Sequence, residues 1–322
     1  MSYFASAPTN ILSMVVFAKH GLKERINLCL FFQSLADILF MTVNFLIYVD
    51  RIYLEVSGLA RRGPIIQFIL GNYLVGFYAF NSASRFMTMV IACERCFCVL
   101  SPLRSQTVLQ TKTTLVILLL AFFTIVGTGF VIATRWGLNC VFNPRTNSTS
   151  FELYPSKFYR NNKKAVDTLD GYIYGIVLPG IFLLVVCITT IITVVKLKKV
   201  ASWREQSSSA AMTVRDVTLT RMLIGCSFLF IGCTIPAVVF RTMIVVIPDI
   251  SLRGRYLNTF TFMTSVTELF GYINSSCNFF IYYTIGSKFR ATVDSMCCRK
   301  RKAKAKRVDT NTLHKSVSVG VM

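Results

Sequence analysis

Long apolar runs separated by short polar segments dominate the chain. Six of these runs reach the length of about 20 residues that a helix needs to cross a membrane. They lie near 26–49, 65–93, 113–134, 170–195, 219–247 and 256–283. A shorter apolar run, Tyr3 to Ala18, has 16 residues, with no charged segment before it and no small-residue cleavage site after it. We interpret this run as the second half of a first helix, which is then N-terminally truncated.

These runs predict an all-α membrane protein with a seven-transmembrane helix bundle. The bundle and a short amphipathic eighth helix are expected to form one receptor-sized domain over residues 3–297, followed by a basic, disordered tail at 298–322. The seven expected helices lie near 3–18, 26–49, 65–100, 112–134, 170–196, 218–247 and 256–283, and the eighth near 286–297.

The distribution of charge predicts the orientation in the membrane. The chain has 35 Lys and Arg residues against 14 acids, and a net charge of +21. If the first run passes from outside to inside, 22 of the 35 basic residues fall in the inner connectors 19–25, 94–112, 196–221 and 288–322. Positively charged loops stay in the cytoplasm. We therefore expect a multi-pass plasma-membrane protein with a cytoplasmic C-terminus, whose basic residues contact membrane lipids and not nucleic acid.

An acid–arginine pair, Glu94 and Arg95, stands at the inner end of the third predicted helix and is followed by Pro102-Leu103. A carboxylate can hold an arginine in a resting state and release it when the helices separate. The alternative is an arginine that only extends to the lipid headgroups.

Further motifs follow in a fixed order along the predicted helices. Asn10 stands in the first helix, Asn27-Leu28 and Asp37 in the second, and Asn274-Ser275-Ser276-Cys277-Asn278-Phe279-Phe280-Ile281-Tyr282 in the last. Together with the Glu94–Arg95 pair, these residues resemble the motifs of rhodopsin-like G-protein-coupled receptors over residues 10–298. The segment from Gly21 to Leu30 resembles mollusc chemosensory receptors, which are similar to invertebrate peptide receptors of the FMRFamide type.

The resemblance implies a receptor and not an enzyme, without a cofactor. Its partners would be an extracellular ligand, either a chemosensory cue or a neuropeptide, and a heterotrimeric G protein. The residues that it assigns to the switch and to G-protein coupling are Glu94, Arg95, Cys96, Phe230, Pro236, Asn278 and Tyr282.

Three positions depart from the family pattern. Phe279 replaces the proline of the last helix, Thr234 replaces a tryptophan, and Leu70 replaces the cysteine of the third helix, so Cys140 is either a free thiol or pairs between chains. These departures leave open a non-signalling or fragmentary receptor relic. A transporter is a further alternative, but transporters usually contain internal repeats and the sequence shows none.

The resemblance also places the ligand site on the outer side. Phe77 stands where amine receptors have an aspartate, and Tyr272 where opsins have a lysine. Glu268 and Arg241 are the charged groups expected to face the cavity, where they suit a zwitterionic, amidated or basic ligand. Pairing of Glu268 with Arg241 or with loop residues is the alternative.

Asp37, Ser84, Asn274 and Asn278 resemble the sodium site of the family, a cavity lined by oxygen ligands. Arg85 stands at about the same depth as Asp37. We expect its guanidinium to neutralise Asp37 directly and to make sodium redundant.

Two modifications are expected outside the membrane. Asn147-Ser148-Thr149 is an N-glycosylation sequon in the second outer loop. Cys297 and Cys298 follow the amphipathic segment and are candidates for palmitoylation.

Overall fold

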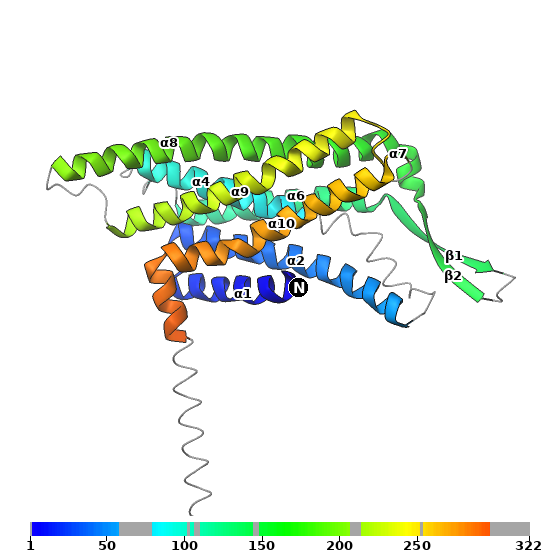
Figure 1. The fold of residues 1–322 in the computed structure, drawn as a ribbon, viewed down its shortest axis with the longest axis horizontal. Coiled ribbons are helices and arrows are strands. Elements are labelled where there is room, and N and C mark those ends of the chain that lie inside the picture. Colours follow the sequence, from blue (N-terminus) through cyan, green and yellow to red (C-terminus); the bar gives the residue numbers. More distant parts are fainter. Residues whose placement is uncertain are drawn as a thin grey trace, which may run out of the picture.

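The protein is a bundle of long helices from which a two-stranded hairpin projects at one end (Figure 1). The computed structural model describes residues 2–57, 79–101, 104–105, 110–143, 148–206, 214–251 and 254–296. The helices are α1 (Ser2–His20), α2 (Arg25–Ser57), α4 (Asn81–Leu100), α6 (Thr111–Ala133), α7 (Lys157–Asp167), the π-helix η2 (Thr168–Val177), α8 (Leu178–Gln206), α9 (Val214–Val246) and α10 (Leu257–Ile285). The strands are β1 (Trp136–Asn143) and β2 (Ser148–Pro155).

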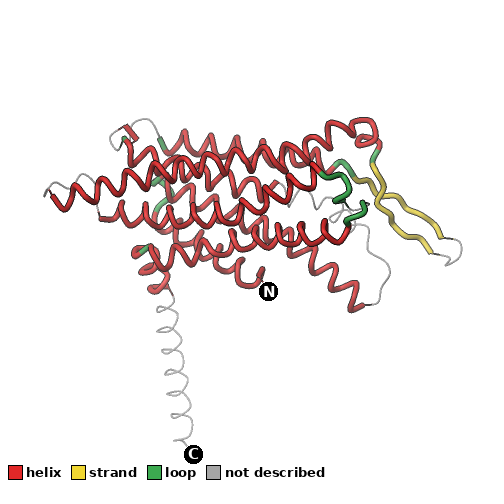
Figure 2. Tube along the Cα trace, turned by 45° about the horizontal axis from the view of Figure 1, so that its top comes forward, coloured by secondary structure: helices red, strands yellow, loops and turns green. Residues whose placement is uncertain are grey.

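Residues 287–296 form a further helical segment, which turns away from the axis of α10 at the end of the bundle opposite the hairpin (Figure 2). We call this end, where α4 and α10 finish, the inner end, and the end that carries β1 and β2 the outer end.

Helix α4 occupies the centre of the bundle. It packs against α2, α6, α8 and α9, while α1 packs against α2 and α10. Helix α9 lies between α8 and α10 and contacts both. Side chains on α4 therefore meet groups from several helices that are distant in the sequence.

The bundle is apolar outside and partly polar inside. Large side chains such as Leu120, Phe123 and Phe262 are exposed, by 64, 67 and 66% respectively. Polar side chains such as Asn10 and Asp37 are buried. Four described stretches are long and apolar enough to cross a membrane: Arg25–Leu46, Thr111–Gly129, Lys157–Lys199 and Val217–Val246. A lipid environment explains this arrangement, since only hydrocarbon accommodates such an apolar exterior without cost.

The described helices can be set beside the ranges expected from the sequence. Helix α6 covers 111–133 where 112–134 is expected, and α10 covers 257–285 where 256–283 is expected. Residues 65–78 of the expected third helix lie outside the described part of the chain. The sequence predicts a loop between the fourth and fifth helices, whereas the structure has the hairpin of β1 and β2 and the helix α7 there.

Arg135 joins the outer ends of α6 and α7. Its guanidinium donates to Asp167 Oδ1 and to Asp170 Oδ2, each at 2.8 Å, and stacks 5.2 Å from the centre of the Tyr159 ring. The Tyr159 hydroxyl donates to the same Asp167 carboxylate at 3.0 Å. One arginine thereby fixes the start of η2 relative to α6.

We expect Arg135→Ala to destabilise the outer end because it removes both ion pairs. Asp167 is 43% exposed, so solvent screens its pair, and the total loss should be about 1 kcal/mol. That loss corresponds to a fall of roughly 2–4 °C in the melting temperature of the detergent-solubilised protein. Arg160→Ala, at an exposed position of α7, is the control. An equal effect of the two substitutions would contradict the role of Arg135.

Candidate functional site

Glu94 and Arg95 form a two-point ion pair near the inner end of α4. Arg95 Nε donates to Glu94 Oε2 at 2.5 Å, and Arg95 Nη2 donates to Glu94 Oε1 at 2.8 Å. The pair is only 12% and 6% exposed at the two side chains, so water screens it weakly. Bidentate geometry of this kind makes a strong and directional contact.

The Glu94 carboxylate also gathers donors from other parts of the chain. Arg25 at the start of α2 lies 3.9 Å from it, between Arg25 Nε and Glu94 Oε1. Cys98 Sγ donates to Glu94 Oε1 at 3.3 Å, and Arg25 Nη1 donates to the Ser105 carbonyl. Glu94 and Arg25 together therefore connect α2, α4 and the segment after α4.

Arg95 borders a small cavity between α4, α8 and α9. The cavity is lined by Ala92, Arg95, Thr190, Thr193, Thr220, Leu223, Ile224 and Ser227. The hydroxyl of Thr190 is buried there without a hydrogen-bond partner. A movement of α9 away from α4 would open this cavity and expose the guanidinium.

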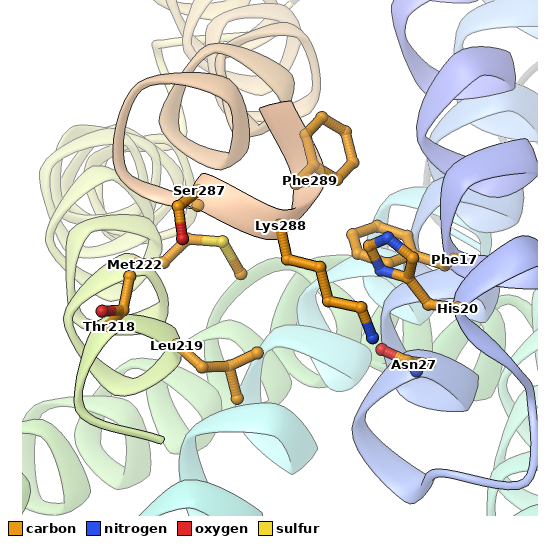
Figure 3. A pocket seen from close by; sticks show the side chains of 10 residues that line it. Phe17, His20, Asn27, Thr218, Leu219, Met222, Ser287, Lys288 and Phe289 are labelled. Carbon is orange, nitrogen blue, oxygen red and sulfur yellow. The ribbon is translucent and has the colours of Figure 1, made fainter. Parts of the chain in front are cut away.

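A larger pocket of about 280 Å³ opens beside it at the inner end. Figure 3 shows Phe17 and His20 of α1 on one side and Leu219 and Met222 of α9 on the other. Lys288 of the segment 287–296 extends across the pocket toward Asn27 of α2 (Figure 3).

The segment 287–296 is anchored to the bundle at this pocket. His20 Nε2 and Thr292 Oγ1 lie at hydrogen-bond distance, 3.0 Å. The Phe289 ring packs against Phe17 and Tyr282, with centroid distances of 5.4 and 5.6 Å. Tyr282, which is 1% exposed, also contacts Phe17 at 5.4 Å. The ends of α1 and α10 and the segment 287–296 therefore share one aromatic cluster.

A polar cluster surrounds Asp37 in the middle of the bundle. Ser84 donates to Asp37 Oδ1 at 2.7 Å, and Ser275 and Asn278 face the same carboxylate without reaching hydrogen-bond geometry. Asp37 Oδ2, Ser275 Oγ, Ser276 Oγ and Asn278 Nδ2 are buried without partners. Asn10 of α1 donates to the Ser275 carbonyl at 3.2 Å. The unsatisfied oxygens suit a small cation or ordered water.

Arg85 does not pair with Asp37, and the expectation that it neutralises this carboxylate is wrong. Its side chain lines a different cavity together with Tyr174 and Arg241. The physical reason is helix geometry: neighbouring residues on a helix do not face the same partner. Since Ser84 points at Asp37, Arg85 is turned away from it.

The proposed ligand residues Arg241 and Tyr272 lie in different places in the described structure. Arg241 lines the Arg85 cavity, whereas Tyr272 is buried between α10 and α2, where it donates to Asn44 Oδ1 at 3.3 Å and packs 5.9 Å from Phe40. Glu268 is partly buried on α10. Phe77 lies outside the described residues, as do Asn147, Cys297 and Cys298.

The remaining switch residues lie in the core of the bundle. Phe230 is fully buried and packs with Phe182 and Val186 of α8, while Cys96 is 6% exposed. Pro236 lies inside α9. The sequence did not single out Gln33 and Thr88, whose side chains form a buried hydrogen bond of 3.0 Å between α2 and α4. A buried glutamine in an apolar run was the available signal.

Comparison with known proteins adds a family match to this geometry. The model of the serpentine-type 7TM GPCR chemoreceptor Srw family matches residues 2–300. Over 148 residues the chain is 31% identical to a probable G-protein coupled receptor, frpr-1, of Caenorhabditis elegans. That match covers 46% of this chain and 33% of the relative, so the chain spans about a third of the length of this relative.

We expect Tyr282→Ala to destabilise the inner end because it leaves a cavity in the aromatic cluster with Phe17 and Phe289. The cost should be about 3–5 kcal/mol, seen as a large fall in melting temperature in detergent. Tyr282→Phe keeps the ring and should cost only about 1 kcal/mol. Phe280→Ala, at a neighbouring site that is 55% exposed, is the matched control. Similar losses for Tyr282→Ala and Phe280→Ala would contradict the packing role.

Proposed function

The chain belongs to the serpentine-type seven-transmembrane GPCR chemoreceptor family Srw, and on this premise we propose that it binds an extracellular ligand and activates a heterotrimeric G protein at the plasma membrane. As a G-protein-coupled receptor it is a multi-pass membrane protein, and family membership implies a receptor without enzymatic activity. The ligand would be a chemosensory cue, as the family name suggests, or a neuropeptide.

The observation that carries the proposal is the Glu94–Arg95 pair beside the cavity at α8 and α9. The pair holds Arg95 within the bundle, and the threonines and Ser227 around the cavity offer it no competing charge among the described lining residues. If ligand binding favours a conformation in which α9 moves outward, Arg95 leaves Glu94 and becomes available to the G protein. The Glu94–Arg95 contact then stabilises the resting state.

We further propose a rhodopsin-like arrangement of seven spans with the segment 287–296 as an eighth helix on the inner membrane surface. The contacts of Phe289 with Phe17 and Tyr282 support this position of the segment. The excess of Lys and Arg in the inner connectors supports a cytoplasmic C-terminus. Asn147 as a glycosylation site and Cys297 and Cys298 as lipidation sites fit the same orientation.

The departures from the rhodopsin-like pattern do not interrupt the described helices. Helix α10 runs through Phe279 from Leu257 to Ile285, and Phe279 packs 5.7 Å from Phe289. Thr234 is 2% exposed within α9. These positions are accommodated in a packed bundle, which favours a working receptor over a relic.

A sodium ion at Asp37 is the second element of the proposal. Asp37, Ser84, Ser275 and Asn278 would hold it, and the buried oxygens Asp37 Oδ2 and Ser275 Oγ, which have no hydrogen-bond partner, fit a cation that prefers oxygen ligands. Asn274, the fourth residue expected from the sequence, is partly buried on α10. Because Arg85 lies in another cavity, it does not replace the ion.

We expect Arg95→Ala to abolish G-protein activation. Glu94→Gln should raise basal activation several-fold, because it weakens the contact that holds Arg95. Guanine-nucleotide exchange in membranes that contain the receptor and a panel of G proteins measures both without a known agonist. The double substitution Glu94→Gln with Arg95→Ala should return exchange to background. Surface labelling checks expression, and Arg160→Ala at the outer end is the control. Basal exchange that persists in the double variant would overturn the assignment.

We expect sodium to raise the melting temperature of the purified protein by about 2 °C relative to choline at equal ionic strength, because a bound ion stabilises the folded state. Asp37→Asn should remove the difference between sodium and choline. Arg85→Leu should leave it unchanged, since Arg85 does not contact Asp37. A sodium effect that appears only after Arg85→Leu would show that Arg85 does neutralise Asp37.

A further inference from the structure

Helix α7 places a group of positive charges at the outer end of the bundle, beside the hairpin (Figure 1). Its 11 residues include one acid, Asp167, and four basic residues, Lys157, Arg160, Lys163 and Lys164. All four basic residues are exposed, and we call them the α7 cluster. The rule that positive charge gathers in the inner connectors does not account for this cluster, because α7 lies at the opposite end of the bundle.

The acids that follow the α7 cluster in the sequence are engaged elsewhere. Asp167 accepts from Arg135 Nη2 at 2.8 Å and from the Tyr159 hydroxyl at 3.0 Å. Asp170 accepts from Arg135 Nη1 at 2.8 Å. Within the described part of the chain, no ion pair joins a carboxylate to any member of the α7 cluster. Like charges at neighbouring positions of a helix destabilise it, and a bound polyanion would offset this repulsion.

The rest of the protein holds α7 in place without a partner. Ser156 caps its first turn, since the Ser156 hydroxyl accepts from the Tyr159 N–H at 3.0 Å. Val166, near the other end of α7, is only 1% exposed. Arg160 Nε donates to the Pro155 carbonyl at 3.0 Å, which attaches one member of the cluster to the end of β2. The backbone that carries the cations is therefore already ordered, which lowers the entropic cost of binding.

The surroundings of the α7 cluster distinguish between candidate anions. None of the three cavities described above has a lining residue from α7. The large side chains of a peptide bind tightly only when such cavities receive them. The negatively charged lipids of a plasma membrane lie in its cytoplasmic leaflet, away from α7 in the proposed orientation. A polymer whose own charges make the contacts therefore fits this surface better than a peptide or a lipid.

We propose that the α7 cluster binds a sulfated polysaccharide of the extracellular surface. Its four cations fall within positions 157–164, and basic runs of this length are typical of sites for heparin-like polymers. The backbone is kinked at Asn162, between the first two cations and the last two, and the repeated sulfates of a flexible polymer supply a partner to each pair. The inference goes beyond the proposed activation of a G protein. Only the extracellular source of the polymer rests on the proposed orientation.

The test measures protection of lysines from acetylation in the purified full-length protein in detergent. Mass spectrometry gives the labelling rate of each lysine, so polymer that binds to the basic tail at 298–322 is counted separately. The polymers compared are a heparin fragment, the same fragment after removal of its sulfates, and polyglutamate of equal charge. We expect the heparin fragment to slow the labelling of Lys157, Lys163 and Lys164 about threefold, because bound polymer covers their amines.

The other two polymers decide whether sulfate is recognised. The desulfated fragment and polyglutamate should each protect the α7 lysines less than half as well as the heparin fragment. A smaller difference for polyglutamate would identify a surface for acidic peptides and overturn the proposal. A smaller difference for the desulfated fragment, or unchanged labelling of the α7 lysines with heparin, would also overturn it.

Two double variants test whether the cluster acts as one site, with Lys157 as the reporter. Lys163→Gln with Lys164→Gln should remove most of the protection of Lys157 by heparin, because fewer charges hold the polymer. Lys198→Gln with Lys199→Gln, an exposed adjacent pair near the inner end of α8, is the matched control and should retain it. Equal protection of Lys157 in the two variants would overturn the proposal. The assay contains no G protein and exposes both ends of the bundle, so an error in the proposed activation or orientation leaves its result unchanged.

Discussion

Burial of charge inside a helical bundle with an apolar exterior is the constraint on which this structure depends. A charge in such a bundle must find its partners among neighbouring helices, because neither lipid nor bulk water supplies them. Glu94 illustrates the consequence. Its one carboxylate binds Arg95 on its own helix, lies near Arg25 of α2 and accepts from Cys98. The inner ends of α2 and α4 are thereby held in one arrangement.

Helix α4 carries a second cation, Arg85, for which the bundle provides no such carboxylate in its described cavity. Both cavities that border an arginine of α4 have α9 as another wall, through Leu223 and Ser227 at the inner end and Arg241 in the outer half. Helix α9 runs from Val214 to Val246, and Pro236 lies in it between the two cavities. Helix α9 is therefore the element that both cavities share with α4.

The sequence carries the locations of the apolar helices and the identity of the acid–arginine pair, since both depend on residues close together in the chain. The resemblance to the sodium site of the receptor family also brings Asp37 and Ser84 together correctly. The depth of a residue in its helix does not determine which neighbouring helix its side chain faces, however. For this reason the sequence predicts the wrong partner for Arg85. The Arg135 contacts with Asp167 and Asp170 join residues more than 30 positions apart. The register that brings such residues together is set by tertiary packing, and local patterns do not encode it.

The π-helix η2 forms one wall of the cavity that Arg85 and Arg241 line, and its geometry is related to Pro179, which follows it. Pro179 has no N–H group, so it cannot donate to the carbonyl of Gly175 as an α-helix would require. The chain instead forms the π-helix η2 before it, in which Leu178 N–H reaches back to the Ile173 carbonyl. The wider π turns alter which residues face inward, and they direct Tyr174 and Gly175 toward Arg85 and Arg241. Replacing Pro179 by alanine would permit a regular α-helix and rotate these residues out of position. The proline therefore acts on this cavity through the geometry of η2, even though it is not among the described residues that line it.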